Sequence, residues 1–120
     1  MEPIINATSF GSITVEGNQF NHDILISLEG QITKRKKKLS KQVYGTSHTL
    51  SLAEAEHVYQ EGAETLIFGG GQFDQCRLSE EAEAFFKEKN CEVKILPTEE
   101  AIQAWNEARG KVIGLFHITC

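Results

Sequence analysis

The chain contains few of the residues on which disulfide-rich and metal-binding proteins depend. Its 120 residues include only three cysteines and two prolines. The cysteines are Cys76, Cys91 and Cys120, an odd number without a close pair, which argues against a disulfide framework and against a Cys-x-x-Cys metal or redox site. We expect buried thiols that pack as small hydrophobic side chains, with Cys120 as the one to watch because it is C-terminal.

Long hydrophobic runs are also missing. No apolar stretch approaches the ~20 residues that a helix needs to span a bilayer. Glu2 stands where a signal peptide carries positive charge, and no long apolar segment follows it. We therefore expect a cytoplasmic protein, or the mature form of a processed precursor, that does not span a membrane.

Positive charge is scarce outside one short segment. The net charge is −5, from 12 basic and 17 acidic residues, and six of the basic residues lie between Lys34 and Lys41. The other six stand against all 17 acidic residues, which leaves −11 for the rest of the chain. This balance disfavours a general nucleic-acid binder, because counterion release requires concentrated positive charge.

The basic segment allows two interpretations. As a functional surface, it would bind an acidic protein partner, RNA or lipid headgroups through Lys34, Arg35, Lys36, Lys37 and Lys38. As an ordinary surface, it would be a solvated strand edge or loop. The nearest aromatic residue is Tyr44, so the base-stacking pattern of a single-strand binder is missing. We favour the ordinary surface, with a protein partner second.

Alternating polar and apolar residues predict an antiparallel β-meander in the first third of the chain. Residues 12–16 place Ile13 and Val15 on one face, and Gly17-Asn18 is the predicted two-residue turn. A return strand is predicted over residues 19–28 and a third strand from residue 31. If the lysines continue this third strand, it must be an edge or a projecting arm, because it cannot be buried on both faces.

From Ser51 onward, helical and strand patterns alternate. Ser51 and Glu54 have the spacing of a capping box, and Ser79 and Thr98 are the predicted N-caps of two further helices. The first helix is predicted to end at Gly62 and the third at Gly110. Strands are predicted over residues 65–68, 91–96 and 111–117, the last of them central because it is apolar on both faces.

This order predicts an α/β fold in a single domain over residues 1–120. Strands that alternate with helices form a mostly parallel sheet, here flanked by three helices, and the meander would add an antiparallel layer. Hydrophobic residues make up 40% of the chain, which suffices for a core. No repeat, linker or low-complexity tract divides the chain, apart from the basic segment.

A glycine triplet is the first candidate ligand site. Gly69-Gly70-Gly71 follows an apolar strand, and α/β folds bind ligands at the carboxyl ends of their strands. Backbone amides there could approach a phosphate or carboxylate, with Gln72, His48 and Thr98 nearby. The dinucleotide pattern fails, however, because Asp74 occupies the position of the third glycine. The alternative, which we favour, is that the glycines permit an irregular loop or close packing against another backbone segment.

No complete catalytic or metal-binding constellation is present in the sequence. The histidines are His22, His48, His57 and His117, and none has the spacing of a helical metal pair. We interpret His117 as a hydrogen-bonded core imidazole and His48, in a loop, as the better acid–base candidate, although stabilisation of that loop is the more common role. Most carboxylates fall on polar helix faces, where they are expected to be solvated. We predict no cofactor, no metal and, on balance, no enzyme.

The stretch from Gly45 to the end resembles a known family. Its matching segments are residues 65–71, 93–101, 105–107 and 114–120, which closes with His117-x-Thr119-Cys120. These segments are similar to those of the adipogenesis-associated Mth domain-containing proteins, a family of unknown function whose superfamily includes an assembly factor of mitochondrial respiratory complex I. Relatives commonly carry Trp and Arg after the third strand, where this sequence has its run of lysines.

The resemblance implies a compact α/β domain with an additional β layer and no settled enzymatic activity. It favours an accessory or assembly module that binds another protein. A small anionic-ligand binder or unrecognised enzyme using Gly69–Gly71 is the second hypothesis, and RNA binding through the basic segment is the third. The sequence identifies neither a partner nor an oligomeric state.

Overall fold

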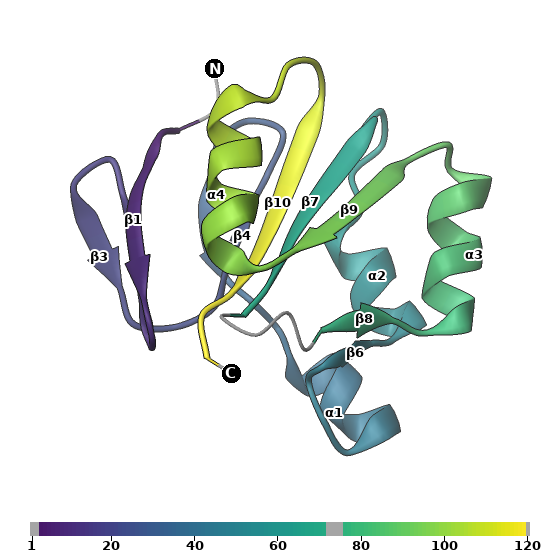
Figure 1. The fold of residues 1–120 in the computed structure, drawn as a ribbon. Coiled ribbons are helices and arrows are strands. Elements are labelled where there is room, and N and C mark those ends of the chain that lie inside the picture. Colours follow the sequence, from purple (N-terminus) through teal and green to yellow (C-terminus); the bar gives the residue numbers. More distant parts are fainter. Residues whose placement is uncertain (1–2, 72–75, 120) are drawn as a thin grey trace.

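The computed structural model describes residues 3–71 and 76–119, which form three sheets and four helices (Figure 1). The small antiparallel sheet has the order β1-β2-β3, and the central sheet has the order β5-β4-β10-β7-β9. A third sheet pairs β6 with β8 in parallel. The strands are β1 (Ile5–Ser9), β2 (Ser12–Val15), β3 (Asn18–Phe20), β4 (Ile24–Ile26), β5 (Ile32–Lys34), β6 (Thr49–Leu50), β7 (Thr65–Gly70), β8 (Arg77–Leu78), β9 (Glu92–Leu96) and β10 (Val112–His117). The helices are α1 (Lys38–Tyr44), α2 (Leu52–Val58), α3 (Glu80–Glu88) and α4 (Thr98–Glu107).

The predicted α/β class is confirmed, with β10 at the centre of the five-stranded sheet as expected. β10 pairs in parallel with β7 and antiparallel with β4. All six residues of β10 are buried, because α4 and the small sheet cover one face and α2 and α3 cover the other (Figure 1). The strand is therefore apolar on both sides.

Two apolar clusters lie on opposite faces of the central sheet. On β7, Ile67 belongs to the cluster beneath α4 and the small sheet, whereas Leu66 and Phe68 belong to the cluster beneath α2 and α3. This alternation follows from the two-residue period of a strand. Trp105 of α4 packs edge-to-face on Phe116 in the first cluster.

The predicted meander is wrong in its grouping. Its return strand divides into β3 in the small sheet and β4 in the central sheet, and a strand that the sequence pattern missed, β1, pairs with β2 instead. The hairpin turn is one residue earlier than predicted. Glu16 and Gly17 both have positive φ, 50° and 82°, as a turn of the primed type requires.

The helix ends also differ from the predictions. The run of lysines does not extend β5 but leads into α1, a helix that the sequence pattern did not predict. α2 ends at Val58 rather than at Gly62, and α4 ends at Glu107 rather than at Gly110. Pro97, not Thr98, is the N-cap of α4, because the Thr98 hydroxyl is used elsewhere in the fold.

Candidate functional site

A buried polar cluster lies where β10 ends, formed by Asp23, Arg35, Glu54 and His117. Asp23 precedes β4, Arg35 follows β5, Glu54 belongs to α2 and His117 is the last residue of β10. All four are buried, with exposed fractions of 4% or less. Buried charges must be paired, and these residues pair with one another.

Arg35 is at the centre of the cluster. Its Nε donates to Glu54 Oε2 at 2.6 Å, its Nη1 to Asp23 Oδ2 at 3.1 Å, and its Nη2 to the carbonyl oxygen of Ser47 at 2.9 Å. Burial alone would lower the pKa of Arg35, but the hydrogen bonds and negative charges of Glu54 and Asp23 raise it instead. The guanidinium is therefore committed to the interior, and Arg35 is not part of an exposed basic surface.

Glu54 departs from the prediction that the carboxylates are mostly solvated. The separate prediction that Ser51 caps this helix is confirmed, because the amide of Glu54 donates to Ser51 Oγ at 3.1 Å. The carboxylate itself is fully buried, where it accepts from Arg35 and, at 2.5 Å, from the Ser40 hydroxyl. A capping-box pattern alone does not distinguish a solvated glutamate from a buried one.

His117 is a hydrogen-bonded core imidazole, as predicted. Its Nδ1 lies 2.7 Å from Asp23 Oδ2, and its Nε2 lies 3.4 Å from Thr119 Oγ1. Burial raises the pKa of Asp23, but His117, the backbone amide of Ile118 and Arg35 together lower it below its ordinary value. Asp23 therefore stays ionised and holds the ring of His117 in place.

His48, the predicted acid–base candidate, lies next to this pair. The rings of His48 and His117 meet edge-to-face with centroids 5.4 Å apart. Partial burial, together with His117, Arg35 and Arg77, lowers the pKa of His48. A neutral imidazole at pH 7 can accept a proton, which is consistent with the role considered for His48.

The glycine triplet is mostly strand, not loop. Gly69 and Gly70 end β7 between β9 and β10, and all three glycines are buried. A Cβ on Gly69 would lie 3.0 Å from the ring of Phe116, so close packing explains at least this glycine. The amide of Gly71 donates to Thr98 Oγ1 at 2.9 Å. Gln72, the fourth member of the predicted site, lies outside the described residues.

Thr98 links the ends of the two central strands. Its hydroxyl donates to the carbonyl oxygen of His117 at 2.7 Å while it accepts from Gly71, and its amide donates to the carbonyl oxygen of Gly71 at 3.0 Å. The structure thus brings three members of the predicted site, Thr98, Gly71 and His48, together around His117. The Gly71 amide and the Thr98 hydroxyl, which would contact a ligand, are hydrogen-bonded to each other.

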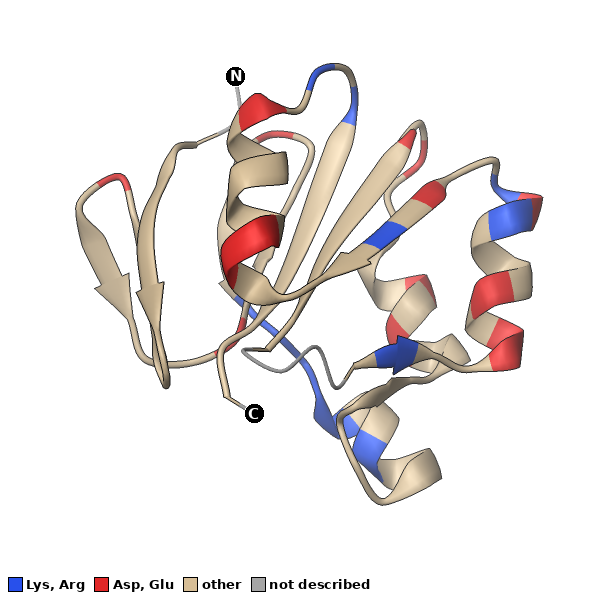
Figure 2. Ribbon diagram, in the orientation of Figure 1, with Lys and Arg blue, Asp and Glu red and all other residues tan. Residues whose placement is uncertain are grey.

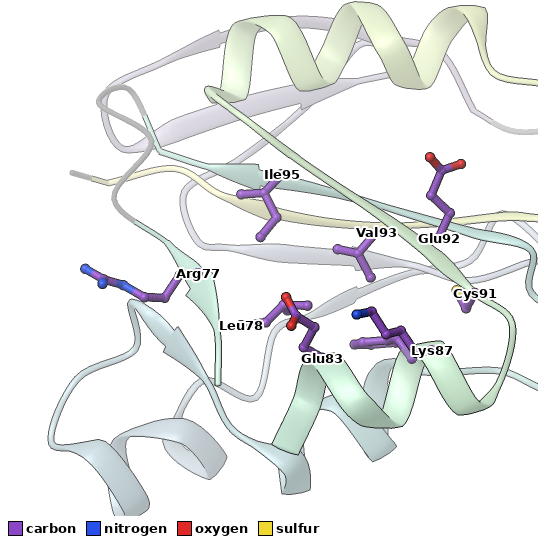
Figure 3. A pocket seen from close by; sticks show the side chains of 9 residues that line it. Arg77, Leu78, Glu83, Lys87, Cys91, Glu92, Val93 and Ile95 are labelled. Atoms are coloured by element: carbon purple, nitrogen blue, oxygen red, sulfur yellow. The ribbon is translucent and has the colours of Figure 1, made fainter. Parts of the chain in front are cut away.

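A cleft that the sequence pattern did not predict lies between α3 and β9 (Figure 3). It has a volume of about 480 Å³, and its apolar lining residues include Leu78, Phe86, Val93 and Ile95. Arg77, Glu83, Lys87 and Glu92 supply charges of both signs around it. β9 is an edge strand of the central sheet, and sequence periodicity does not reveal which strand lies at an edge.

The basic segment forms a nearly continuous positive stretch that leads from β5 into α1 (Figure 2). Of its predicted partner-binding residues, Lys34, Lys36 and Lys38 are exposed and Lys37 is half-buried. α1 adds exposed Lys41 and two apolar side chains, Val43 and Tyr44, which are 60% and 39% exposed.

Two further searches concern the described part of the chain. Within residues 3–71 and 76–119, no group of three or more His, Cys, Asp or Glu side chains is arranged to hold a metal ion. No helix in these residues is long and apolar enough to cross a membrane.

Comparison with known proteins supports a family assignment. Residues 5–117 match the family model described as "Protein of unknown function (DUF498/DUF598)". The chain is similar to the conserved hypothetical protein PH1505 from Pyrococcus horikoshii, at 32% identity and a TM-score of 0.87 over 97% of this chain and 98% of that one. The structure titled MT938 is 31% identical, with a TM-score of 0.82 over 99% and 100% of the two chains.

A more distant likeness concerns the fold alone. A protein from Bordetella pertussis, described as a Mth938-like domain, is 18% identical to this chain. The match covers 97% of this chain and 85% of that one, with a TM-score of 0.64. The arrangement of sheets and helices is thus shared with this protein as well.

Proposed function

Because the chain belongs to the DUF498/DUF598 family of proteins of unknown function, we propose from its own surface that it is a non-enzymatic accessory protein that binds another protein. The observation that carries the proposal is the joint exposure of lysines and apolar side chains on α1 and the residues before it. Lys36, Lys38 and Lys41 lie within one turn or two of Val43 and Tyr44. Protein–protein interfaces combine apolar side chains at their centre with a polar and charged rim.

The charge of this surface indicates the chemistry of the partner. The basic segment carries six positive charges between residues 34 and 41. Arg35 is paired with carboxylates in the interior, whereas none of the five lysines forms an ion pair within residues 3–71 and 76–119. A partner with an acidic segment that also presents apolar side chains would match it, and opposite charges would speed their association. The resemblance to the adipogenesis-associated proteins, whose superfamily includes a complex I assembly factor, supports an accessory or assembly role.

Affinity purification with matched variants tests this proposal. Lys36, Lys38 and Lys41 are replaced together by Glu, and the control replaces Lys87, Lys94 and Lys111 by Glu, which makes the same change of charge elsewhere. We expect a stoichiometric partner to be retained by the wild-type protein and by the control, and to be lost from the first variant. Equal retention by both variants, or no enriched partner with any of the three proteins, contradicts the proposal.

The alternative function, a small anionic-ligand binder or an unrecognised enzyme at Gly69–Gly71, has less support. Gly69 and Gly70 are buried in β7, and the amide of Gly71 is bonded to Thr98. His48 is the feature that favours it, because its neutral ring is partly exposed beside His117. Titration with inorganic phosphate would support this function if the amide resonances of Gly70 and Gly71 shifted in a saturable way.

A further inference from the structure

A second cavity, of about 260 Å³, lies where β5 leads into α1, beside the residues that follow β10. We propose that it binds a small compound through a phosphate group or a similarly compact dianion. The cavity is distinct from the glycine triplet. Its two lysines belong to the basic segment, but they are not the lysines that the test of the protein-binding surface replaces. Its volume lies below the range of about 300–1,000 Å³ typical of pockets for drug-sized ligands, so it suits a small ligand.

Two lysines supply the positive charge of this cavity. Lys34, the last residue of β5, and Lys37, the N-cap of α1, both line it. Within residues 3–71 and 76–119, neither ammonium group forms an ion pair with a carboxylate. An ammonium group is a compact point charge that binds phosphate well, and two of them match the charge of a dianion.

Arg35 also lines the cavity, but four of its five guanidinium N–H groups donate to acceptors within the protein. Its Nε and both Nη atoms donate to Glu54, Asp23 and the carbonyl oxygen of Ser47. Arg35 instead fixes the position of the neighbouring lysines. Because Arg35 is anchored in the interior, the chain on either side of it is held in place, and Lys34 and Lys37 come to the same cavity from the strand and from the helix.

Among the described residues that line the cavity, Asp23 is the one carboxylate, and it would repel an anion if it were free. Both of its oxygens are occupied from within the protein. Oδ2 lies 3.1 Å from Arg35 Nη1 and 2.7 Å from His117 Nδ1, and Oδ1 accepts from the amide of Ile118 at 3.0 Å. Asp23 and Glu54 together carry two negative charges, against one positive charge on Arg35. These three side chains leave a net charge of about −1, and the two positive charges of Lys34 and Lys37 exceed it.

Further polar side chains complete the site. Thr119 lines the cavity with a hydroxyl that lies 3.4 Å from His117 Nε2, longer than a strong hydrogen bond, so it can turn toward a ligand. Asn21 lines the same wall with an amide side chain. His22 also lines it, but its Nδ1 lies 2.9 Å from the carbonyl oxygen of Asp23 and is used within the protein. Phosphate oxygens accept hydrogen bonds from such groups in addition to those from ammonium groups.

Nuclear magnetic resonance titration of the full chain with inorganic phosphate, against chloride at constant ionic strength, tests the proposal. We expect saturable shifts of the amide resonances of Lys34, Ile118 and Thr119, with a Kd of about 1 mM or below. In K34Q/K37Q the affinity should fall by about tenfold, because both ammonium groups that pair with the dianion are removed. In the matched control K36Q/K38Q it should change by less than about threefold.

Three outcomes overturn the proposal. They are the absence of saturable shifts in the wild-type protein up to about 20 mM phosphate, equal weakening in both variants, and shifts centred on Gly70 and Gly71. An unchanged amide spectrum of K34Q/K37Q without phosphate shows that the variant is folded. The result can be told apart from that of the affinity purification, because the variant used there replaces Lys36, Lys38 and Lys41 and leaves Lys34 and Lys37 unchanged.

Discussion

At Arg35, one guanidinium pairs with carboxylates from two separate parts of the chain, Asp23 and Glu54. All three side chains are buried, and every guanidinium nitrogen has an acceptor. Removing one member of such a group leaves the others charged and unpaired in the interior. The energetic importance of Arg35 therefore lies in what its loss would expose rather than in its contribution to the surface charge.

Replacing Arg35 by Gln should lower the free energy of unfolding by about 3–5 kcal/mol, because Glu54 and Asp23 would lose their partner. Denaturation by urea measures this change. The adjacent replacement Lys36→Gln is the control and should stay within about 0.5 kcal/mol, since Lys36 is exposed. If both variants were equally stable, the buried position of Arg35 would be contradicted.

The lowered pKa of Asp23 predicts that the protein loses stability in acid. The pKa of Asp23 in the folded protein is lowered from its ordinary value of 3.8. The unfolded chain therefore binds a proton more readily, so Asp23 stabilises the fold above about pH 4, and this contribution disappears as the pH falls through the folded pKa. The free energy of unfolding, measured between about pH 6 and pH 2, should decline more steeply in the wild type than in Asp23→Asn, by up to about 1.4 kcal/mol per pH unit. Parallel curves would contradict this assignment.

At the scale of elements, α4 is tied to the sheet at its start and to the small sheet near its end. Trp105 Nε1 donates to the carbonyl oxygen of Pro3 at 2.8 Å, and Asn106 exchanges two hydrogen bonds with the backbone of Ile5, of 3.0 and 2.9 Å. At its first residue, Thr98 binds Gly71 and His117. α4 therefore positions the small sheet and the ends of β7 and β10.

The start of α4 predicts a specific effect of the Thr98 hydroxyl. Thr98→Val keeps the shape of the side chain but leaves the amide of Gly71 and the carbonyl group of His117 without this partner. We expect a loss of about 1–3 kcal/mol in the free energy of unfolding. Thr98→Ser retains the hydroxyl and should recover most of that loss. Equal losses in the two variants would show that the methyl group, rather than the hydroxyl, matters at this position.

At the scale of the whole molecule, the small sheet and the central sheet share one apolar cluster. Ile13 and Val15 of β2 pack in the same cluster as Trp105 and Phe116. A shared cluster makes independent unfolding of the small sheet costly, because its separation would expose apolar side chains on both sides. The predicted single domain over residues 1–120 follows from the same reasoning and remains a prediction.

Replacing the fully buried Ile13 by Ala should lower the free energy of unfolding of the entire chain by about 2–5 kcal/mol. The fluorescence of Trp105, the single tryptophan, and the far-ultraviolet circular dichroism should report coincident unfolding transitions. The control is Leu52→Ala, at a side chain that is 37% exposed, and its effect should be smaller. Two separate transitions in the Ile13 variant would contradict a shared core.

Local sequence patterns were sufficient for the order of most elements. Ser51 and Ser79 cap α2 and α3 as their spacing indicates, and β10 is central as its continuous apolar run indicates. These features depend on neighbours in the chain and on simple burial, which a sequence displays directly. The family resemblance likewise rests on short segments that keep their order.

Only the tertiary structure decided which sheet each early strand joined and which charged residues entered the interior. The residues of β3 and β4 were predicted as one strand, because the alternation of polar and apolar residues does not indicate which strand pairs with them. α1 was not predicted, because it is too short and too exposed to produce a clear helical period. Arg35 lies among five lysines in the sequence, yet it alone is buried with two carboxylates from distant positions. Charge pairing of this kind depends on distances in space, and periodicity along the chain does not contain them.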